Sequence, residues 1–346
     1  MVVTAPLLIW GAGAIGGTVG AYMIRAGYDV LFVDQAKDHV DALNEAGLAI
    51  EGPIEEFHVP ARAVTPDDLD GTFPVIWLCT KAQHTEDATR ALVPHLTPDG
   101  YVLSLQNGLN EMTISDIIGR GSTLGAFVNF GADYLGPGRV LFGGRAAVVV
   151  GELDGSQTDR LTQTHRLLSV FEPNAITTPH IWGYLWGKLG YGALLFATAL
   201  TNDSIADVLE HVEYRPTLTA LARELTVLAD AQQVDPQGFN GYDPAAFRPD
   251  ADPLITTASF AAMVAHNRTS AKTHSGIWRD LAVRKRRTEV DPQLTKPIEV
   301  GAALGHPMPL TRRLVTLIQD IEQGHRSLSY DTLDALKAAF DKGDCS

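Results

Sequence analysis

The sequence predicts an α/β protein in which a doubly wound sheet is followed by an all-helical domain. The first observation is Leu7–Asp34, where an apolar run enters a glycine turn, a helix follows and a second apolar run ends. The second is a series of apolar runs without alternation, typical of parallel strands covered on both faces. The third is a change to helical segments beyond Pro179. Because 346 residues exceed the usual size of one core, we expect two domains, 1–179 and 180–346.

The glycine turn carries Gly11, Gly13 and Gly16 at the spacing GxGxxG. This is the spacing of a Rossmann dinucleotide-binding unit, in which the glycines permit a tight turn, backbone approach to a pyrophosphate and close helix packing. The pyrophosphate is expected at the helix N-terminus, against the backbone of Gly13, Ala14, Ile15 and Gly16. The alternative is a turn that only packs a helix on a sheet. The flanking strands and helix favour dinucleotide binding.

Asp34 ends the second apolar run of this unit. A carboxylate at that place accepts hydrogen bonds from the adenosine ribose and repels a 2′-phosphate. The next residues, Gln35 and Ala36, are not basic, whereas Lys37 is. We therefore expect NAD as the cofactor, with NADP left open by Lys37.

Further elements follow in alternation, which favours a doubly wound sheet. We expect a helix at 38–46, irregular structure or a short hairpin at 48–60, a strand at 75–79, a helix at 85–96, a strand at 101–105, strand-like segments between 123 and 151 that extend the sheet, partly antiparallel, a helix at 159–171 and an edge strand at 175–178.

Two stretches of the helical half need a separate interpretation. The apolar run 189–200 contains two glycines and is shorter than the roughly 20 residues of a membrane span, so it predicts a buried helix. The stretch 235–253, rich in Pro, Gly, Asp and Phe, predicts a long loop that covers a site or merely connects helices; the connection is the simpler interpretation.

Composition narrows the function classes. A formal charge of −14 argues against a nucleic-acid partner and favours small-molecule chemistry. Two cysteines, Cys79 and Cys345, offer neither a disulfide framework nor the spacing of a metal site, and Cys79 is interpreted as a buried hydrophobe. The N-terminal residues lack the features of a secretory signal, so we expect a cytoplasmic protein without a membrane partner.

Polar residues follow two further predicted strands, and open α/β sheets bind ligands beyond the carboxyl ends of their strands. Lys81 follows one strand and is placed either to contact cofactor phosphate or ribose, or to face solvent at the start of a helix. Asn107 lies in a Gln-Asn-Gly sequence, and Asn-Gly is also an ordinary turn dipeptide. The placement favours a functional Lys81 and leaves Asn107 open.

The helical half carries two charges in unusual surroundings. Lys188 lies in the apolar stretch IWGYLWGKLGYGALLF, where an unpaired buried ammonium ion is costly. It either reaches solvent between glycines or faces a cleft and takes part in chemistry. Glu289 follows the basic run 284–287, most simply a solvated helix face, and Ser275 lies upstream. A carboxylate after that run is able to reach a cleft.

Together these motifs carry a resemblance. GAGAIG, TKAQ, QNG, WGKLG and HSG…RRTEVD, in this order along nearly the whole chain, resemble the ketopantoate reductase family, which has the 6-phosphogluconate-dehydrogenase-like arrangement of hydroxyacid dehydrogenases. The resemblance implies a Rossmann domain, a helical substrate domain and an active site in the cleft between them. It also implies hydride transfer between a nicotinamide cofactor and a 2-oxo or 2-hydroxy acid.

The resemblance also implies roles for single residues. It implies that the three motif glycines hold the pyrophosphate, and that Lys81 and Asn107 contact the cofactor and line the cleft. Lys188 matches the family's catalytic lysine, and Glu289 matches its acidic active-site residue. Ser275 lies near the substrate-binding serine, although the spacing to Glu289 is one residue longer here. A lysine suits the reaction because an ammonium group supplies both a proton and positive charge to the developing alkoxide.

The substrate is expected to differ from ketopantoate. The resembled family places asparagines one and two turns after the catalytic lysine, where this chain has Gly192 and Phe196. A missing partner leaves a polar substrate group unsatisfied, at a cost of roughly 1–3 kcal/mol. Thr198, Thr201 or Asn202 can restore polar contacts if the helix register differs. A remodelled pocket for another oxo or hydroxy acid is the favoured interpretation.

Two other function classes compete with an enzyme. A regulatory Rossmann protein would bind a dinucleotide without turnover, but such a sensor has no need of a proton donor like Lys188. A helical interaction protein leaves the glycine motif unexplained. A homodimer is compatible with either class.

Overall fold

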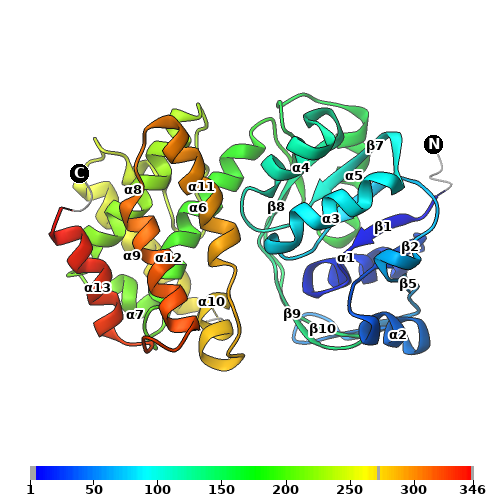
Figure 1. Ribbon diagram of the computed structural model, residues 1–346, viewed down its shortest axis with the longest axis horizontal. Coiled ribbons are helices and arrows are strands. Elements are labelled where there is room, and N and C mark those ends of the chain that lie inside the picture. Colours follow the sequence, from blue (N-terminus) through cyan, green and yellow to red (C-terminus); the bar gives the residue numbers. More distant parts are fainter. Residues whose placement is uncertain (1–4, 271–272, 344–346) are drawn as a thin grey trace. The chain divides into compact units, whose positions relative to one another are not determined.

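The computed structural model describes residues 5–270 and 273–343 (Figure 1). Contacts divide the chain into two compact units, Met1–Ile181 and Trp182–Ser346. The first is an α/β unit with parallel strands, and the described part of the second is helical. The predicted fold class is confirmed.

An eight-stranded sheet forms the centre of the first unit, in the order β12-β11-β8-β7-β6-β1-β2-β5. All neighbours pair in parallel except β11 and β8. The chain winds outward from β1 in one direction and from β6 in the other, which places the topological switch point between these two strands. The strands are β1 (Leu7–Trp10), β2 (Val30–Val33), β5 (Ala63–Val64), β6 (Phe73–Leu78), β7 (Leu96–Ser104), β8 (Thr123–Val128), β11 (Val148–Glu152) and β12 (Ile176–Thr177).

Helices cover both faces of this sheet (Figure 1). Successive residues of β1 belong to different cores: Ile9 packs with the cluster that includes α1 and α5, and Leu8 with the cluster that includes α3 and α4. Both faces are therefore apolar, which explains runs without alternation. The helices are α1 (Ala14–Arg25), α2 (Lys37–Ala46), α3 (Thr85–Leu92), α4 (Asn110–Ile118) and α5 (Asp159–Phe171), with short 3₁₀ turns at Pro66–Asp68, Ala82–His84, Val93–His95 and Arg120–Ser122.

A second, four-stranded sheet has the order β4-β3-β10-β9. It contains β3 (Leu48–Glu51), β4 (Phe57–Val59), β9 (Gly131–Gly136) and β10 (Arg139–Gly144). The hairpin at 48–60 is confirmed, but the expectation that all of 123–151 extends the main sheet is wrong for β9 and β10. Val140 and Phe142 of β10 are buried in the core shared with α1, while their neighbours are at least partly exposed. A strand in an antiparallel pair can have one face buried and the other exposed to solvent, as β10 does.

The helix expected at 85–96 ends early. It stops at Leu92, a 3₁₀ turn follows, and β7 already begins at Leu96 rather than at Tyr101. Pro94 explains the difference, because proline has no backbone N–H to continue the hydrogen bonds of the helix.

The second unit is built from eight helices in its described part. They are α6 (Ile181–Thr198), α7 (Ile205–Glu210), α8 (Arg215–Ala231), α9 (Pro253–Thr269), α10 (Gly276–Trp278), α11 (Val290–Leu304), α12 (Pro309–Glu322) and α13 (Tyr330–Asp341), with a 3₁₀ turn at Pro244–Phe247 and a π turn at Arg279–Val283. Among the residues described, none of the helices has the length and apolar character needed to span a membrane.

The stretch 235–253 does more than connect helices. The N–H of Gln237 donates to the carbonyl of Gly183 on α6 at 2.8 Å. A β-carbon added to Gly187 would lie 2.0 Å from the carbonyl oxygen of Gln237, and one on Gly190 would lie 2.2 Å from the hydroxyl of Tyr242. The glycines of α6 therefore let this loop lie directly on the helix, which a larger residue would prevent.

Candidate functional site

The glycine turn connects β1 to α1 at the switch point of the main sheet. Gly11 has a φ of +100°, and a β-carbon there would lie 2.8 Å from the backbone nitrogen of Thr80, beyond β6. A β-carbon on Gly16 would lie 2.0 Å from the carbonyl oxygen of Gly11, but one on Gly13 would meet no atom within 4 Å. The first and third glycines thus close the turn, and the second leaves room for a ligand.

The start of α1 is accessible. Gly13, Ala14 and Ile15 are half-buried, whereas Gly16 is buried. The first N–H groups of a helix lack partners within it and carry the positive end of the helix dipole. This turn therefore fits a pyrophosphate, as the motif predicts.

Asp34 follows β2 and holds two backbone amides. Its Oδ2 accepts the N–H of Ala12 at 2.9 Å, and its Oδ1 accepts the N–H of Ala36 at 3.0 Å. Carboxylate oxygens keep further lone pairs, so ribose hydroxyls can still bind. Lys37, the nearest predicted basic residue, forms an exposed ion pair with Asp41 at 2.9 Å.

Lys81 and Asn107 follow β6 and β7 as expected. Lys81 is half-buried and Asn107 is exposed. A buried network behind them was not apparent from the sequence: the amide of Gln106 donates to the carbonyl of Thr80 at 2.8 Å, and that of Asn110 donates to the carbonyl of Asn107 at 2.7 Å. These bonds fix both strand ends, and no local sequence signal distinguishes them from ordinary turn contacts.

Lys188 is half-buried near the middle of α6, beside the buried Trp186 and Leu189. The partly accessible positions around it, Tyr184 and Gly192, lie four residues before and after it and so share its face of the helix. The adjacent Gly187 lies under the loop and gives the lysine no path to solvent. Lys188 is therefore accessible along the stripe of Tyr184 and Gly192 rather than past Gly187.

The residues after Lys188 differ in accessibility. A β-carbon on Gly192 would meet no atom within 4 Å, but Phe196 is buried in the helical core. Thr198 and Thr201 donate their hydroxyls to backbone carbonyls at 3.0 and 3.3 Å. Asn202 donates its amide to the carbonyl of Leu328 at 3.0 Å. These three polar groups are thus already engaged within the unit.

Glu289 lies half-buried at the residue that precedes α11. The neighbouring Thr288 anchors this helix start, because its N–H and hydroxyl both donate to Glu322 Oε1, at 2.7 and 2.8 Å. A helix N-terminus interacts favourably with negative charge, so this position suits the carboxylate of Glu289.

The basic run 284–287 is not a helix face. Arg284 and Arg286 both donate to Asp280 Oδ1 at 2.9 Å, which folds the segment back on itself after the π turn. Ser275 is 2% exposed and caps the short helix α10 by accepting the N–H of Trp278 at 3.2 Å. The structure thus gives this hydroxyl a capping role beside the predicted one.

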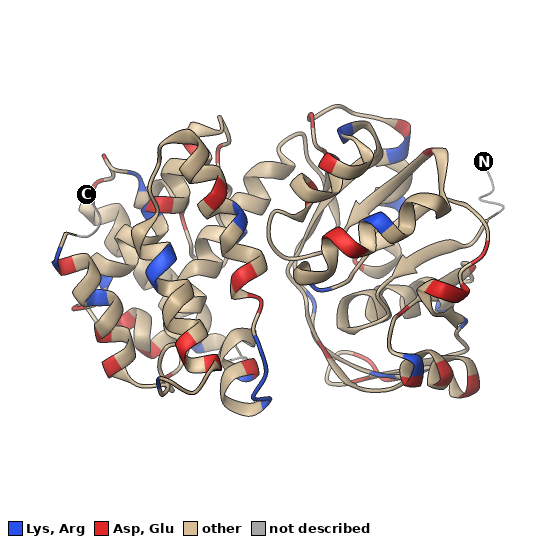
Figure 2. Cartoon of the chain, viewed as in Figure 1, with Lys and Arg blue, Asp and Glu red and all other residues tan. Residues whose placement is uncertain are grey.

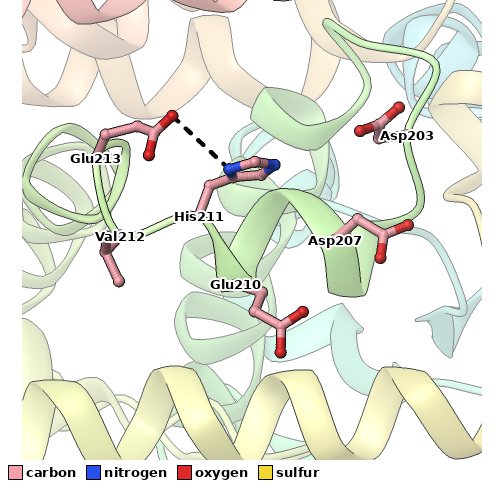
Figure 3. A pocket seen from close by; sticks show the side chains of 6 residues that line it. All are labelled: Asp203, Asp207, Glu210, His211, Val212 and Glu213. Atoms are coloured by element: carbon pink, nitrogen blue, oxygen red, sulfur yellow. Dashed lines mark ion pairs between the residues drawn. The ribbon is translucent and has the colours of Figure 1, made fainter.

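A pocket of about 410 Å³ lies at α7, next to Asn202 in sequence and lined by none of the predicted site residues (Figure 3). It is lined by Asp203, Asp207, Glu210, His211, Val212 and Glu213. Arg268 pairs with two of the carboxylates, at 2.6 and 2.7 Å, and His211 pairs with Glu213 at 3.7 Å. The acidic lining disfavours an anionic substrate, so we do not assign the substrate site here.

Within residues 5–270 and 273–343, His, Cys, Asp and Glu form no group suited to a metal ion. Figure 2 shows basic residues scattered among acidic ones in both units. Cys79 is partly buried against the core of the first unit, and burial raises the pKa of its thiol; Cys345 lies outside the described residues.

Comparisons with known proteins agree with the motif order. Residues 7–155 match the model for "Ketopantoate reductase PanE/ApbA", and residues 180–322 match the model for its C-terminal domain. A 2-dehydropantoate 2-reductase of Archaeoglobus fulgidus is 29% identical over 319 residues, covering 91% of this chain and 97% of that protein. One from Pyrococcus horikoshii is 32% identical over 184 residues, covering 53% of this chain and 59% of that protein.

Solved structures have the same fold. A PanE/ApbA family ketopantoate reductase from Ralstonia eutropha superposes with a TM-score of 0.76 at 25% identity, covering 92% of this chain and 99% of that one. D-mandelate dehydrogenase in complex with NADH and anilino(oxo)acetate has a TM-score of 0.78 at 19% identity, with the same coverage.

Proposed function

Because the chain belongs to the ketopantoate reductase family, we propose that it interconverts a 2-oxo acid and a 2-hydroxy acid, with Lys188 as general acid. Membership of this family makes it an NAD(P)-dependent oxidoreductase that acts on a CH–OH or keto group. The observation that carries the proposal is the position of Lys188 on the accessible stripe of an otherwise apolar α6. The glycine turn with Gly13 supports a dinucleotide site in the first unit.

A bound nicotinamide supplies the hydride to the carbonyl carbon in the reductive direction. Lys188 donates a proton from Nζ to the carbonyl oxygen, and its positive charge stabilises the alkoxide as it develops. The neutral amine then takes a proton from solvent, which restores the ammonium group. Glu289 orients the lysine or the substrate hydroxyl. Ser275, Asn107 and Asn202 remain predicted contacts of the substrate.

The test of this function is turnover by a Lys188→Ala variant. We expect its kcat to fall by roughly 10² to 10⁴, the usual contribution of a general acid, while NADH binding stays largely intact. Nicotinamide absorbance at saturating substrate and a fluorescence titration of the cofactor measure the two quantities. Near-wild-type turnover would overturn the role of Lys188. A large loss of folding stability would instead favour a structural lysine.

Wild-type turnover also separates the enzyme from a regulatory dinucleotide sensor. A panel of 2-oxo acids with NADH and NADPH, and of 2-hydroxy acids with the oxidised cofactors, covers both directions. Cofactor binding without turnover of any acid would favour the sensor.

We propose NAD as the preferred cofactor. Asp34 places a fixed carboxylate at the end of β2, and Lys37 is paired with Asp41. D-mandelate dehydrogenase binds NADH on the same fold, so the fold accommodates this cofactor. Because Asp34 also holds Ala12, alanine would disturb the turn; Asp34→Asn keeps one acceptor and removes the charge. We expect Asp34→Asn to lower the ratio of kcat/KM for NADH to kcat/KM for NADPH. A wild-type kcat/KM favouring NADPH would contradict the proposal.

We also propose a substrate other than ketopantoate, although the named relatives are 2-dehydropantoate 2-reductases. Open space at Gly192 and a buried Phe196 support a pocket without two hydrogen-bonding groups after Lys188. Comparing kcat/KM for ketopantoate with that for branched, aromatic and polyhydroxylated acids tests this. Ketopantoate as clearly the best substrate would overturn it. A homodimer and a cytoplasmic location stay predictions.

A further inference from the structure

His39 is a buried histidine of α2 that the proposed mechanism does not use. Its side chain is 1% exposed and lies between the glycine turn and the turn that joins β9 to β10. Nε2 lies 2.9 Å from the carbonyl oxygen of Ala12, and the N–H of Gly138 donates to Nδ1 at 3.0 Å. One ring thus contacts two turns, and the more distant of them, at Gly138, lies 99 residues from His39 in sequence.

The partners of His39 determine which nitrogen carries the hydrogen. The backbone N–H of Gly138 is a donor, so Nδ1 must accept and carries no hydrogen. The neutral ring then carries its hydrogen on Nε2, which donates to the carbonyl oxygen of Ala12. The ring of Tyr134 packs edge-on against the imidazole, with centroids 5.1 Å apart, and restricts its rotation.

The carbonyl of Ala12 belongs to the same peptide group as the N–H of Gly13. In a planar trans peptide these two groups point in opposite directions. The N–H of Ala12 is separately held by Asp34 Oδ2 at 2.9 Å. Drawing the carbonyl of Ala12 toward His39 therefore turns the N–H of Gly13 the other way, at the glycine whose surroundings are open.

We infer that His39 is a positioning residue for cofactor binding, which orients the Gly13 amide toward the pyrophosphate through its Nε2–H tautomer. The turn between β9 and β10 selects this tautomer through Gly138. The inference rests on the proposed dinucleotide site in the first unit and adds to it a residue outside the motif.

Two substitutions separate the two hydrogen bonds. His39→Asn places an amide oxygen near the position of Nδ1, so it keeps the acceptor for Gly138 and loses the donor to Ala12. His39→Gln extends an amide nitrogen toward the position of Nε2, so it keeps the donor and loses the acceptor. We expect His39→Asn to raise the Kd of NADH roughly 3- to 10-fold, the effect of about one hydrogen bond, and His39→Gln to stay within about 2-fold.

The Kd values come from fluorescence titration of NADH and NADPH, with thermal midpoints measured in parallel. His58→Gln is the matched control, because His58 is an exposed histidine of β4 whose Nε2 contacts the carbonyl of Ala46, away from the glycine turn. Equal Kd changes in the Asn and Gln variants, or none in either, would overturn the positioning role while wild-type binding upheld the dinucleotide site. Failure of the wild-type protein to bind either nucleotide would overturn both.

Discussion

Each unit places glycines on the helix that carries residues of the candidate site, but the glycines pack against different neighbours. In α1, a β-carbon on Gly16 would meet the carbonyl of Gly11 and side chains of the main sheet. In α6, Gly187 and Gly190 face the backbone of Gln237 and the hydroxyl of Tyr242, both in a loop. The first set brings a helix onto a sheet, and the second lets a loop lie on a helix.

This difference explains why one set was recognised in the sequence and the other was not. The glycines of the first unit have a fixed spacing because strand, turn and helix N-terminus have a common geometry in every such unit. A loop on a helix has no standard geometry, so the spacing of Gly183, Gly187 and Gly190 does not predict the loop that packs on them. Both α1 and α6 are therefore rich in glycine, but each for a different packing requirement.

The largest expected effect is that of Gly16→Ala. Its β-carbon would lie 2.0 Å from the carbonyl oxygen of Gly11 and 2.9 Å from side-chain atoms of Ile9 and Cys79, in the centre of the sheet. Because a packed sheet cannot move aside, we expect a loss of about 3 kcal/mol or more in the free energy of unfolding. Denaturant titration measures it.

Gly13→Ala is the control for that variant, since its β-carbon would meet no atom within 4 Å. It should leave the free energy of unfolding nearly unchanged and weaken NADH binding, because the added methyl group occupies the space of the pyrophosphate. If Gly16→Ala and Gly13→Ala were equally stable, the assignment of separate roles to the two glycines would fail.

A smaller effect is expected in α6. Gly187→Ala places a β-carbon 2.0 Å from the carbonyl oxygen of Gln237, but a loop yields more readily than a sheet. We expect a loss of about 1–2 kcal/mol, after a helix-propensity gain of up to about 1 kcal/mol. A β-carbon on Gly192 would meet no atom within 4 Å, so Gly192→Ala should increase the free energy of unfolding by up to about 1 kcal/mol through helix propensity alone. Denaturant titrations giving the same sign for both variants would contradict the packing described for the loop.

The main sheet could be predicted from the sequence because its signals are local. Strands β1 and β2 are the two apolar runs of Leu7–Asp34, and helix α5 has the predicted bounds, since apolar runs and helix patterns are set by neighbouring residues. The second sheet could not be predicted, because β10 pairs with β3, far away in sequence. No local pattern specifies that partner.

The candidate site divides in the same way. Asp34, Lys81 and Asn107 were predicted as site residues from their places after strands, where open α/β sheets bind ligands. His39 and Gln106 were missed, because their roles depend on contacts with Gly138 and Thr80, which lie elsewhere in the chain. Residues predicted to touch a ligand follow motifs, whereas the residues that hold them in place follow the tertiary structure.

The smallest expected effect concerns pH, and it has opposite signs in the two units. In the first, Glu55 accepts a hydrogen bond from Tyr22 and pairs with Arg25, which lowers its pKa below the ordinary 4.5. In the second, burial raises the pKa of Glu224 above 4.5, although Leu310 and Thr311 donate to it. A lowered pKa gives stability that is lost as pH falls through it, and a raised one gives stability that is lost as pH rises through it.

Glu55→Gln and Glu224→Gln test this contrast. The pH range from about 3.5 to about 7 spans the ordinary pKa of a carboxyl group. As the pH rises through this range, the free energy of unfolding of wild type should increase relative to that of Glu55→Gln. Over the same range the free energy of unfolding of wild type should decrease relative to that of Glu224→Gln. Because Glu55 is solvent-exposed, its effect should stay below about 1 kcal/mol. Denaturant midpoints at several pH values measure both, and parallel pH profiles would show that burial does not govern Glu224.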